Sequence, residues 1–599
     1  MKNNAFLLLF LTISFQLNAQ NERKIVILHT NDIHSMLTGY APELAYTPLS
    51  VNDDKTVGGF ARIASIINAE KEKNSGTTLV LDAGDFLMGT LFQGLETKTG
   101  FQLRLMKTMG YDAVCIGNHE FDYGPEMLAE ILNSAVRNGS IPPLMLGNVV
   151  FDPEKPEDDS LEKLFNSGVA GKTCILERGN LKIGLFSLMG VVADHDAALA
   201  PPVTFAKQIP AAKKMVRELQ EKNCDLIICL SHSGVSKENG EWVGEDIKLA
   251  EKVKGIDVII SGHTHTELDK PIIINGIPIV QAGANGQYVG KLSLSLRDGT
   301  VSVEEYSLIP VDDRIKGDES VHSLIQGQKK AITTDILEPI GMEYEKSLAE
   351  NDFLLECEEL GDIKGSNLGP LVADAIYQYI NRHSETGTDI SIVAVGVIRD
   401  KIVPGLQSAP DLFRVMSMGQ GKDNVPGYPL SRLFVTGKEL KGIFEIFQIA
   451  YKSTPAYYLY YSGIRVEYDP DKGLLKKISK IEIISPDGLV RNVDFSKKNN
   501  ELYSITANSY LLEFIGIIKK LSFGLINVVP KDKDGNPVTD MKNAVIDMDE
   551  DKTGLQEGKE WLALVEFLSS MKDTNGNGLP DIDTMYKAPV QTFFVKKKN

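Results

Sequence analysis

The chain is poor in cysteine and tryptophan and carries a large excess of acidic residues. Only five cysteines occur in 599 residues, and three of them, Cys115, Cys224 and Cys229, lie in or beside apolar segments. An odd number of thiols in such places does not predict a disulfide framework. The formal net charge of −18 argues against a nucleic acid or an anionic membrane surface as partner. An anionic substrate would therefore need local compensation by metal ions or clustered arginines.

Long apolar segments are absent after residue 19, so we expect no membrane span in the mature protein. Residues 1–19 have the parts of a signal peptide, namely Lys2, a short apolar core over 5–15 and a small-residue cleavage site at 17–19. No cysteine follows this site, so a bacterial lipid anchor is not expected. We therefore expect an exported protein, periplasmic or secreted. A retained signal-anchor helix is the alternative.

The sequence also lacks period-length repeats and low-complexity tracts, which excludes a solenoid. Its 43% of apolar and 24% of charged residues are typical of a folded domain protein, and its length is too great for a single core. We expect a signal peptide at 1–19, a first domain at 22–312, a connecting helix at 313–339 and a second domain at 340–599.

Apolar strand patterns alternate with helical spacing through the first domain. Strands are expected at 24–29, 77–81, 112–116, 182–188, 225–230 and 258–260, with an extended segment at 144–150. Helices are expected at 58–73, 101–109, 124–137, 206–221 and 245–253. Alternation at this period predicts βαβ units and a largely parallel sheet. The acidic segment 152–167 is expected to be a surface excursion, and 271–311 to be strands joined by hairpin turns.

Polar side chains gather where five of the expected strands end. They are Asp32 and His34, then Asp85, then Asn118, His119 and Asp122, then His232, and finally His263 and His265. In α/β sheets, ligands and catalytic groups collect at the carboxyl ends of strands. A single solvated loop often holds such residues without a role, but here the arrangement recurs five times.

Aspartate, histidine and asparagine offer donors suited to zinc, manganese, iron or magnesium rather than to calcium alone. The set contains more donors than one metal ion needs. Two ions that share one bridging carboxylate fit the number, and such a pair clamps a phosphoryl oxygen while it activates a water molecule.

Five short motifs around these residues occur in an order that is specific to one family. Asp32-x-His34, Gly84-Asp85, Gly117-Asn118-His119-Glu120, Ser231-His232 and Gly262-His263-x-His265 together resemble the calcineurin-like metallophosphoesterase signature. The forms of segments 28–34 and 117–122 resemble its secreted branch, the 5′-nucleotidase and UDP-sugar hydrolase family. The resemblance covers residues 24–310. It implies a metallophosphoesterase sandwich, followed by a connecting helix and a second α+β domain.

The resemblance also implies a role for each residue. Two divalent ions, zinc or manganese, are expected: Asp32, His34, Asp85 and His265 would hold the first, and Asp85, Asn118, His232 and His263 the second, with Asp85 bridging. His119 would be the catalytic histidine, and Asp122 would accept its other ring hydrogen. Asn118 would also contact the substrate. For Asp122 the alternative is a cap of the following helix.

Other polar residues near these motifs are expected to have structural or surface roles. His29 is interpreted as a packing histidine or one that supports a ligand, and Asp82 as a carboxylate that bonds nearby backbone. His195, His322 and His383 are interpreted as surface residues.

The second domain resembles the nucleotide-binding domain of the same family. Ser366–Gly369, Gly396-x-Ile398-Arg399 and Val435–Leu440 occur in the family's order. Arg399 would contact the phosphate, with a surface salt bridge as the alternative.

The nucleobase pocket of this domain departs from the family. Where the family has Pro-Phe-Gly-Asn, with the phenylalanine stacked on the base, this chain has Ser417-Met418-Gly419-Gln420. Met418 is therefore expected to pad the base loosely through its sulfur. Alternatively, a tyrosine between Tyr457 and Tyr461, or Tyr510, supplies the missing stack.

A separate loop, Asp573–Asp583, has oxygen donors at alternating positions and a glycine for a sharp turn. It resembles a calcium loop, but Thr584 stands where a bidentate glutamate is expected. An Asx- and glycine-rich turn without calcium is the alternative.

These features predict an exported, dinuclear metal-dependent phosphohydrolase, a monomer or weak dimer, that acts on nucleoside 5′-monophosphates or related phosphate esters. Alternatives within the same fold are a 2′,3′-cyclic nucleotide phosphodiesterase, a UDP-sugar diphosphatase and a sulfur-ester hydrolase. An inactive metal-bearing surface binding protein is an alternative of another class, although the presence of every expected ligand and of His119 argues against it.

Overall fold

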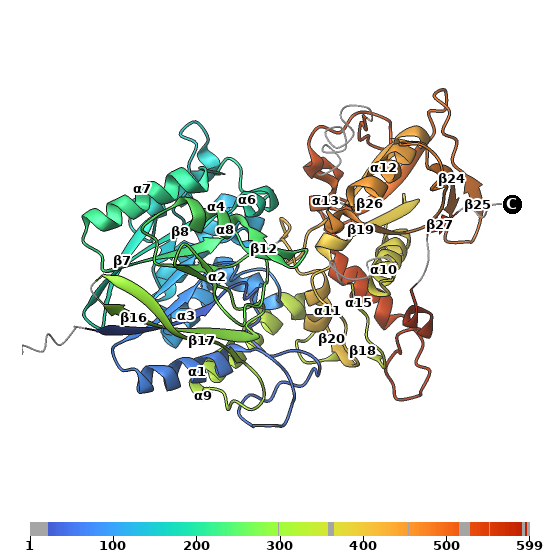
Figure 1. Ribbon diagram of the computed structural model, residues 1–599. Helices are drawn as coiled ribbons and strands as arrows, with labels where there is room; N and C mark the ends of the chain where they lie inside the picture. Colours follow the sequence, from blue (N-terminus) through green and yellow to red (C-terminus); the bar gives the residue numbers. More distant parts are fainter. Residues whose placement is uncertain are drawn as a thin grey trace, which may run out of the picture.

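The computed structural model describes residues 22–297, 299–357, 365–423, 425–452, 454–513, 527–549 and 551–589, and the backbone of 593–595. The chain forms two bodies side by side, the N-terminal one in blue to green and the C-terminal one in yellow to red (Figure 1). The predicted signal peptide lies outside the described residues.

Two sheets make up the N-terminal body. The first has the strand order β17 (Thr300–Pro310), β16 (Tyr288–Arg297), β1 (Arg23–Thr30), β2 (Thr78–Asp82), β3 (Ala113–Cys115), β4 (Leu144–Met145) and β6 (Ala170–Gly171). The second has the order β14 (Ile272–Ile274), β15 (Ile277–Val280), β13 (Val258–Ser261), β10 (Leu226–His232), β8 (Leu181–Met189) and β7 (Thr173–Arg178). The centre of each sheet is parallel, whereas β16, β17, β7 and β14 pair antiparallel at the edges.

Alternating side chains of the strands build two cores. In β1, Ile25 and Ile27 pack between the two sheets, while Val26 and Leu28 face the helices on the other side. Helices α1 (Phe60–Lys73), α3 (Phe101–Met109) and α4 (Gly124–Asn138) cover the first sheet, and α7 (Gln208–Glu221) and α8 (Glu245–Lys252) cover the second. The predicted α/β sandwich is confirmed.

Two local expectations for the first domain need correction. The predicted surface excursion contains the helix α5 (Asp159–Asn166), because Leu161 and Leu164, three residues apart, pack one face of it into the core. The single extended segment expected at 144–150 is divided into β4 and β5 (Val149–Val150), and β5 pairs with β9 (Thr204–Phe205) instead of the main sheet.

The connecting segment contains helix α9 (Glu319–Ile332), which Asp318 caps by accepting from two backbone N–H groups. The C-terminal body has one sheet of β21 (Leu430–Thr436), β26 (Leu502–Asn508), β19 (Ile390–Ala394) and β22 (Leu459–Ser462), and another of β25 (Val490–Asn492), β24 (Ile478–Ile484), β23 (Ile464–Tyr468) and β27 (Phe593–Val595). Its principal helices are α10 (Leu368–His383), α12 (Gly437–Ala450) and α15 (Glu560–Ser569).

Direct contacts join the two bodies. Gln93 donates a hydrogen bond to the carbonyl of Ser417 at 2.7 Å, and the hydroxyl of Tyr40 donates to the carbonyl of Lys401 at 2.6 Å. The Arg414 guanidinium lies 3.5 Å from the centre of the Tyr40 ring, within cation–π range. These contacts set the face of the C-terminal body that carries Arg399 against the N-terminal body.

Across the described residues, no helix has both the length and the apolar character that a membrane crossing requires. Cys115, Cys174, Cys224 and Cys229 form no disulfide within the described residues.

Candidate metal centre

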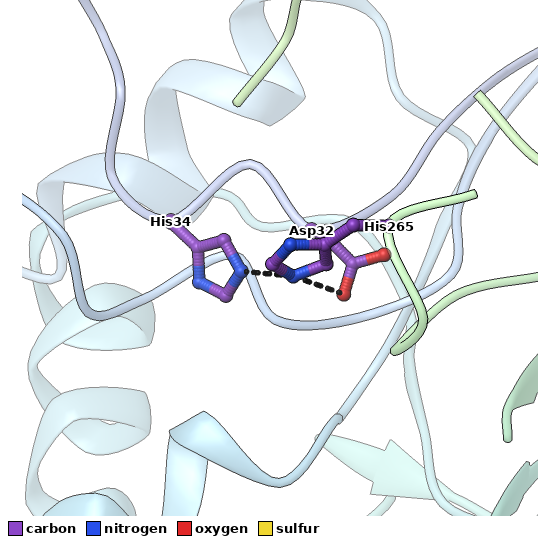
Figure 2. Close-up of side chains that lie close together, drawn as sticks. All are labelled: Asp32, His34 and His265. Carbon is purple, nitrogen blue, oxygen red and sulfur yellow. Dashed lines mark hydrogen bonds and ion pairs between the residues drawn. The ribbon is translucent and has the colours of Figure 1, made fainter. Parts of the chain in front are cut away.

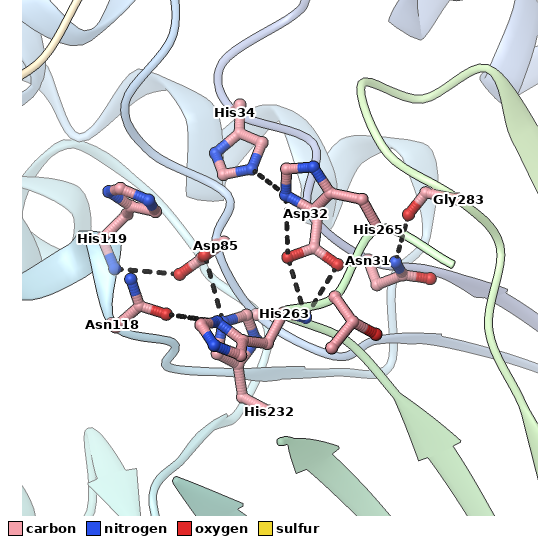
Figure 3. Close-up of polar contacts among 12 residues, drawn as sticks. Asn31, Asp32, His34, Asp85, Asn118, His119, His232, His263, His265 and Gly283 are labelled. Carbon is pink, nitrogen blue, oxygen red and sulfur yellow. Dashed lines mark hydrogen bonds and ion pairs between the residues drawn. The ribbon is translucent and has the colours of Figure 1, made fainter. Parts of the chain in front are cut away.

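The five strand ends singled out in the sequence meet at one edge of the sandwich (Figure 3). Strands β1, β2 and β3 are parallel neighbours in the first sheet, and β10 and β13 are parallel neighbours in the second. Because parallel neighbours end on the same side, the loops that follow them come together.

One group of donors consists of Asp32, His34 and His265, which point toward one another (Figure 2). The Nε2 atoms of His34 and His265 are 3.0 Å apart, and the Nε2 atom of His265 is 3.8 Å from Oδ1 of Asp32. All the donor atoms of this group lie within 4.8 Å of one another.

A second group consists of Asp85, His232 and His263, together with the amide of Asn118. Oδ1 of Asn118 is 3.0 Å from both Nε2 of His232 and Nδ1 of His263, and Oδ2 of Asp85 is 3.1 Å from Nε2 of His232. Asp85 also groups with His34 and His119. Its carboxylate therefore stands between the two groups, where the sequence places a bridging ligand.

Backbone groups hold these side chains in position. The carbonyl of Ala83 accepts from Nδ1 of His232 at 2.9 Å, which leaves Nε2 of His232 as the atom that faces the donors. The carboxylate of Asp32 accepts from the backbone N–H of His263 at 3.0 Å. The loops after β1 and β13 are thereby tied to each other.

The backbone at this edge adopts an uncommon conformation. Asp32, His34, Asp85, His263 and His265 all have positive φ values, between 51° and 73°. Side chains other than glycine, asparagine and aspartate rarely adopt this left-handed region, and such strain collects at functional sites. Five of the seven candidate ligands share it, which is an indication of function independent of the sequence motifs.

Glu120 fixes the loop that carries Asp85, a role that the sequence motif alone did not reveal. Its carboxylate accepts from the backbone N–H groups of Gly117 at 2.6 Å and Leu87 at 2.9 Å. At Gly117 an added Cβ would come within 2.3 Å of Oδ1 of Asp85, so only glycine allows this close approach. Asp246 plays a similar role for the second sheet, because its carboxylate accepts from Ser231 and Ser261 at the ends of β10 and β13.

The electrostatics of the site suit a divalent cation. Burial lowers the pKa of His263 and of His265 to about 3, so both imidazoles are neutral and present lone pairs. Burial also acts to lower the pKa of His232, but the charges of Asp85 and Asp32 outweigh it and raise the pKa to about 10. His232 would therefore have to lose a proton in order to bind a metal ion through Nε2. Buried carboxylates and imidazoles that converge in this way are the donor set that zinc and manganese bind, so the residues fit the two ions that the family resemblance implies.

His119 lies beside this donor set and is held by Asp122. Its Nδ1 atom is 2.6 Å from Oδ2 of Asp122, so its Nε2 atom is the one that faces the site. Burial opposes protonation, but the charges of Asp122 and Asp85 raise the pKa of His119. No side chain caps helix α4 among the described residues, so the geometry favours the histidine partner over the helix cap for Asp122.

Arg399 comes from the C-terminal body and reaches the same place. Its Nη2 atom is 3.4 Å from Nε2 of His119, and its backbone N–H donates to Val415 at 2.9 Å. Asp400, the next residue in the chain, pairs with Arg414 at 3.2 Å. The charge of Arg399 adds to the effect of burial in lowering the pKa values of His34 and His265.

The two candidate residues for the nucleobase contact, Met418 and Tyr510, differ in how much of the side chain is accessible. Met418 is only 7% exposed and belongs to the hydrophobic core, so it offers little surface to a ligand. Tyr510 is half-buried and stacks on Tyr428, with ring centres 5.3 Å apart and planes 12° apart. Burial and the charges of Asp122 and Asp196 raise the pKa of Tyr510, so these carboxylates interact electrostatically with its hydroxyl.

The remaining polar residues have the surroundings expected of them. His29 is fully buried and stacks on Tyr306, and burial lowers its pKa to about 3. Asp82 accepts from the backbone N–H of Gly84. His195 and His383 are exposed, and His322 is half-exposed on α9.

The side chains of the Asp573–Asp583 loop bond the loop's own backbone. Asp573 accepts from Gly576 and Gly578, and Asp581 accepts from Thr574 and Asn575. This is the pattern of an Asx- and glycine-rich turn, and calcium at this loop stays a prediction.

Comparisons with known proteins agree with both halves of the structure. The calcineurin-like phosphoesterase family matches residues 25–267, and the 5′-nucleotidase C-terminal domain matches residues 355–516. Bovine 5′-nucleotidase is 26% identical over 524 residues, covering 82% of this chain and 83% of that protein. An apyrase from Aedes albopictus is 27% identical over 492 residues, covering 77% and 78%.

A solved structure extends the likeness to the whole fold. The 5′-nucleotidase precursor from Thermus thermophilus matches with a TM-score of 0.66 and 21% sequence identity, covering 96% of this chain and 100% of that one. The N-terminal match defines the class, so the protein is a metallophosphoesterase and hence a hydrolase. With the C-terminal domain in place as well, the chain belongs to the 5′-nucleotidase family.

Proposed function

We propose that the protein releases inorganic phosphate from nucleoside 5′-monophosphates with the help of two divalent metal ions. The observation that carries this proposal is the approach of Arg399 to within 3.4 Å of His119, directly beside the convergent donors. A phosphate monoester is an anion that one guanidinium, one imidazolium and a pair of cations can hold together.

Asp32, His34, Asp85 and His265 would hold one ion, and Asp85, Asn118, His232 and His263 the other. When bound, such a pair supplies a Lewis acid for the phosphoryl oxygens and lowers the pKa of water so that it can attack phosphorus. Zinc and manganese both suit this mixture of imidazole and carboxylate donors.

The protein's own groups orient and stabilise the reacting phosphate. Arg399 would form a charge-assisted hydrogen bond to a phosphoryl oxygen. This bond would orient the phosphate relative to the metal ions. His119 would donate its Nε2 proton toward the phosphoryl or leaving oxygen, while Asp122 keeps the Nδ1 proton in place. Asn118 lies beside His119 with its amide oxygen toward His232 and His263 (Figure 3), so its amide nitrogen is left to contact the phosphate.

Among the aromatic residues in the described part of the chain, Tyr510 is our candidate for the nucleobase contact. Its ring is held by Tyr428 on one face, and the backbone next to it is fixed because Asn508 accepts from the N–H of Leu511 at 2.7 Å. Asn508 is held in turn by a hydrogen bond to Glu560 at 2.9 Å. We therefore assign to Tyr510, rather than to the core residue Met418, the stacking role that the sequence left open.

Export, the domain boundaries and the monomer or weak dimer stay predictions from the sequence. The residues that predict export are 1–19, which lie outside the described residues.

The test is an assay of phosphate release by purified protein whose metal content is measured in the same samples. The substrates are AMP, UMP, ribose 5-phosphate, an aryl phosphate, a 2′,3′-cyclic nucleotide and a UDP-sugar. We expect the nucleoside 5′-monophosphates to be hydrolysed most efficiently and chelation to abolish the reaction. Greater efficiency on the cyclic nucleotide or the UDP-sugar would overturn the proposed substrate class.

A further inference from the structure

We call the edge of the sandwich that carries the seven candidate metal ligands the metal edge. A short helix beside it carries a carboxylate that the proposed reaction does not use. Helix α6 (Val191–Asp196) follows β8 directly. Gly190 donates its N–H to the carbonyl of His232 at 2.9 Å, and the N–H groups of Val191 and Val192 donate to the carboxylate of Glu245 at 2.7 and 3.0 Å. The helix is therefore fixed both to a strand that carries a candidate metal ligand and to the start of α8.

Asp196, at the end of this helix, reaches the metal edge. Its Oδ2 atom is 3.8 Å from Nε2 of His263, the ring nitrogen that faces away from Asn118. The side chain is 48% exposed, so it stands at the surface of the site and not within it. The charges of His119 and Arg399 act to lower the pKa of Asp196, and the charge of Asp196 acts to raise the pKa values of Tyr457 and Tyr510.

Lysine and arginine are scarce around this carboxylate, which contacts the adjacent His195, with Nδ1 of His195 3.3 Å from Oδ1 of Asp196. Within the described part of the chain, Arg399 is the only arginine or lysine among the leading influences on the pKa values of His34, His119, His265, Asp196 and Tyr510. One guanidinium and two bound ions can neutralise a single phosphate group. A second phosphate would need further cations, and the next charged group is Asp196, which has the opposite sign.

The placement of Asp196 bears on substrates with more than one phosphate. If a nucleoside diphosphate is to lose its terminal phosphate, that group must occupy the position between the donors and Arg399. If the base stacks on Tyr510, the inner phosphate would lie between this position and Tyr510. The charge of Asp196 acts on Tyr510, so it would also repel a phosphate there. A nucleoside monophosphate places only its uncharged ribose there.

We infer that Asp196 restricts the enzyme to substrates with a single phosphate by repelling the inner phosphate of nucleoside di- and triphosphates. The inference rests on the proposed function, since it assumes that the scissile phosphate binds between the metal donors and Arg399. Asp196 is a specificity-determining residue in this account and takes no part in the reaction itself.

The test compares Asp196→Asn with Asp194→Asn. Both variants remove one negative charge from α6 without changing side-chain size, and both residues are exposed neighbours of His195. They differ in that the charges of His119 and Arg399 act on the pKa of Asp196 and are not among the influences on the pKa of Asp194. The value of kcat/KM for AMP, ADP and ATP is measured for the wild type and both variants, and the metal content of each sample is determined.

We expect Asp196→Asn to raise the efficiency on ADP relative to AMP at least about fivefold, and that on ATP further, while Asp194→Asn leaves both ratios within about twofold of the wild type. An unchanged ratio in Asp196→Asn, or the same change in both variants, would overturn the inference. Loss of bound metal in Asp196→Asn would also overturn it, because Asp196 would then act through His263.

A binding measurement separates this inference from the proposed function. If metal-loaded wild type releases no phosphate from AMP, the proposed function fails. Calorimetry with AMP and a methylene-bridged analogue of ADP then decides the role of Asp196. Tighter binding of the diphosphate analogue alone by Asp196→Asn, at least about fivefold, supports the inference, and equal affinities in wild type and variant contradict it.

Discussion

The metal edge of the N-terminal body and the nucleotide-facing side of the C-terminal body are built in different ways. At the metal edge, buried ligands follow directly after parallel strands, and backbone hydrogen bonds and left-handed residues fix them. On the other side, Arg399 is exposed after β19, and Tyr510 stands on the short helix α13 (Ser509–Glu513). The comparison suggests that the chemistry depends on a rigid sandwich, while substrate choice depends on loops that vary more easily.

The largest effect is expected at the carboxylate between the two donor groups. Asp85→Asn should abolish phosphate release and reduce the bound metal at both positions, because one carboxylate serves each. Metal analysis together with an activity assay checks this, with the exposed Asp159→Asn as the matched control. A variant that kept two ions and its activity would show that Asp85 is not the bridge.

The next largest effect concerns catalysis without metal binding. His119→Ala should lower kcat by about 10² to 10⁴-fold, which is the usual contribution of a proton donor, while the metal content stays that of the wild type. His383→Ala, at an exposed histidine of the C-terminal body, serves as the control. Loss of metal from the His119 variant would make His119 a ligand and contradict its proposed role.

A smaller effect is expected for the residue that crosses between the two bodies. Arg399→Ala removes a charge-assisted hydrogen bond to the phosphate, a loss of about 1.5–3 kcal/mol, which corresponds to roughly 10 to 150-fold in kcat/KM. Arg382→Ala, whose guanidinium pairs with Glu566 far from the metal edge, is the matched control. If both variants behaved like the wild type, Arg399 would be a surface residue.

The nucleobase contact should be weaker still. Base stacking on an aromatic ring contributes about 1–3 kcal/mol, so Tyr510→Leu should reduce the preference for AMP over ribose 5-phosphate by up to about 100-fold. Met418→Leu, a substitution of similar volume in the core, should leave the preference unchanged. A reduced preference for AMP in Met418→Leu, together with an unchanged preference in Tyr510→Leu, would instead assign the nucleobase contact to Met418.

The smallest effect tests the rigidity of the N-terminal body through a buried carboxyl. Burial raises the pKa of Glu96 to about 8, well above its value of about 4.3 in an unfolded chain. Unfolding then releases a proton, so stability falls as the pH rises from about 4.5 to 8 and levels off above. Glu96→Gln should flatten this decline and raise stability at pH 8 by about 1–3 kcal/mol. Denaturant unfolding between pH 5 and 9 measures it, with the exposed Glu154→Gln as control. A wild type whose stability does not fall over this range would contradict the expectation.

Much of the metal edge was predictable from the sequence because its ligands lie within a few residues of apolar strands. The strand pattern placed Asp85 and His232 at strand ends, and parallel pairing then brings those ends together. The positive φ values of the ligands carry no sequence signal, since histidine seldom adopts them.

Contacts between distant segments could not be predicted. Asp196 follows His195, which the sequence marks only as a surface residue, and the packing of α6 against Glu245 brings Asp196 to the metal edge. Tyr510 was one of several candidate tyrosines, and its stacking on Tyr428 depends on two segments that lie far apart in the sequence. The helix α5 was missed because eight residues give too little periodicity beside an acidic, proline-bearing segment.

The most direct test of the central claim is a metal titration. Apo protein prepared by chelation is titrated with manganese or zinc while phosphate release from AMP is recorded. The account predicts that activity rises from zero and reaches its plateau at two equivalents of metal per chain. Full activity without added metal, or a plateau at one equivalent, would contradict it.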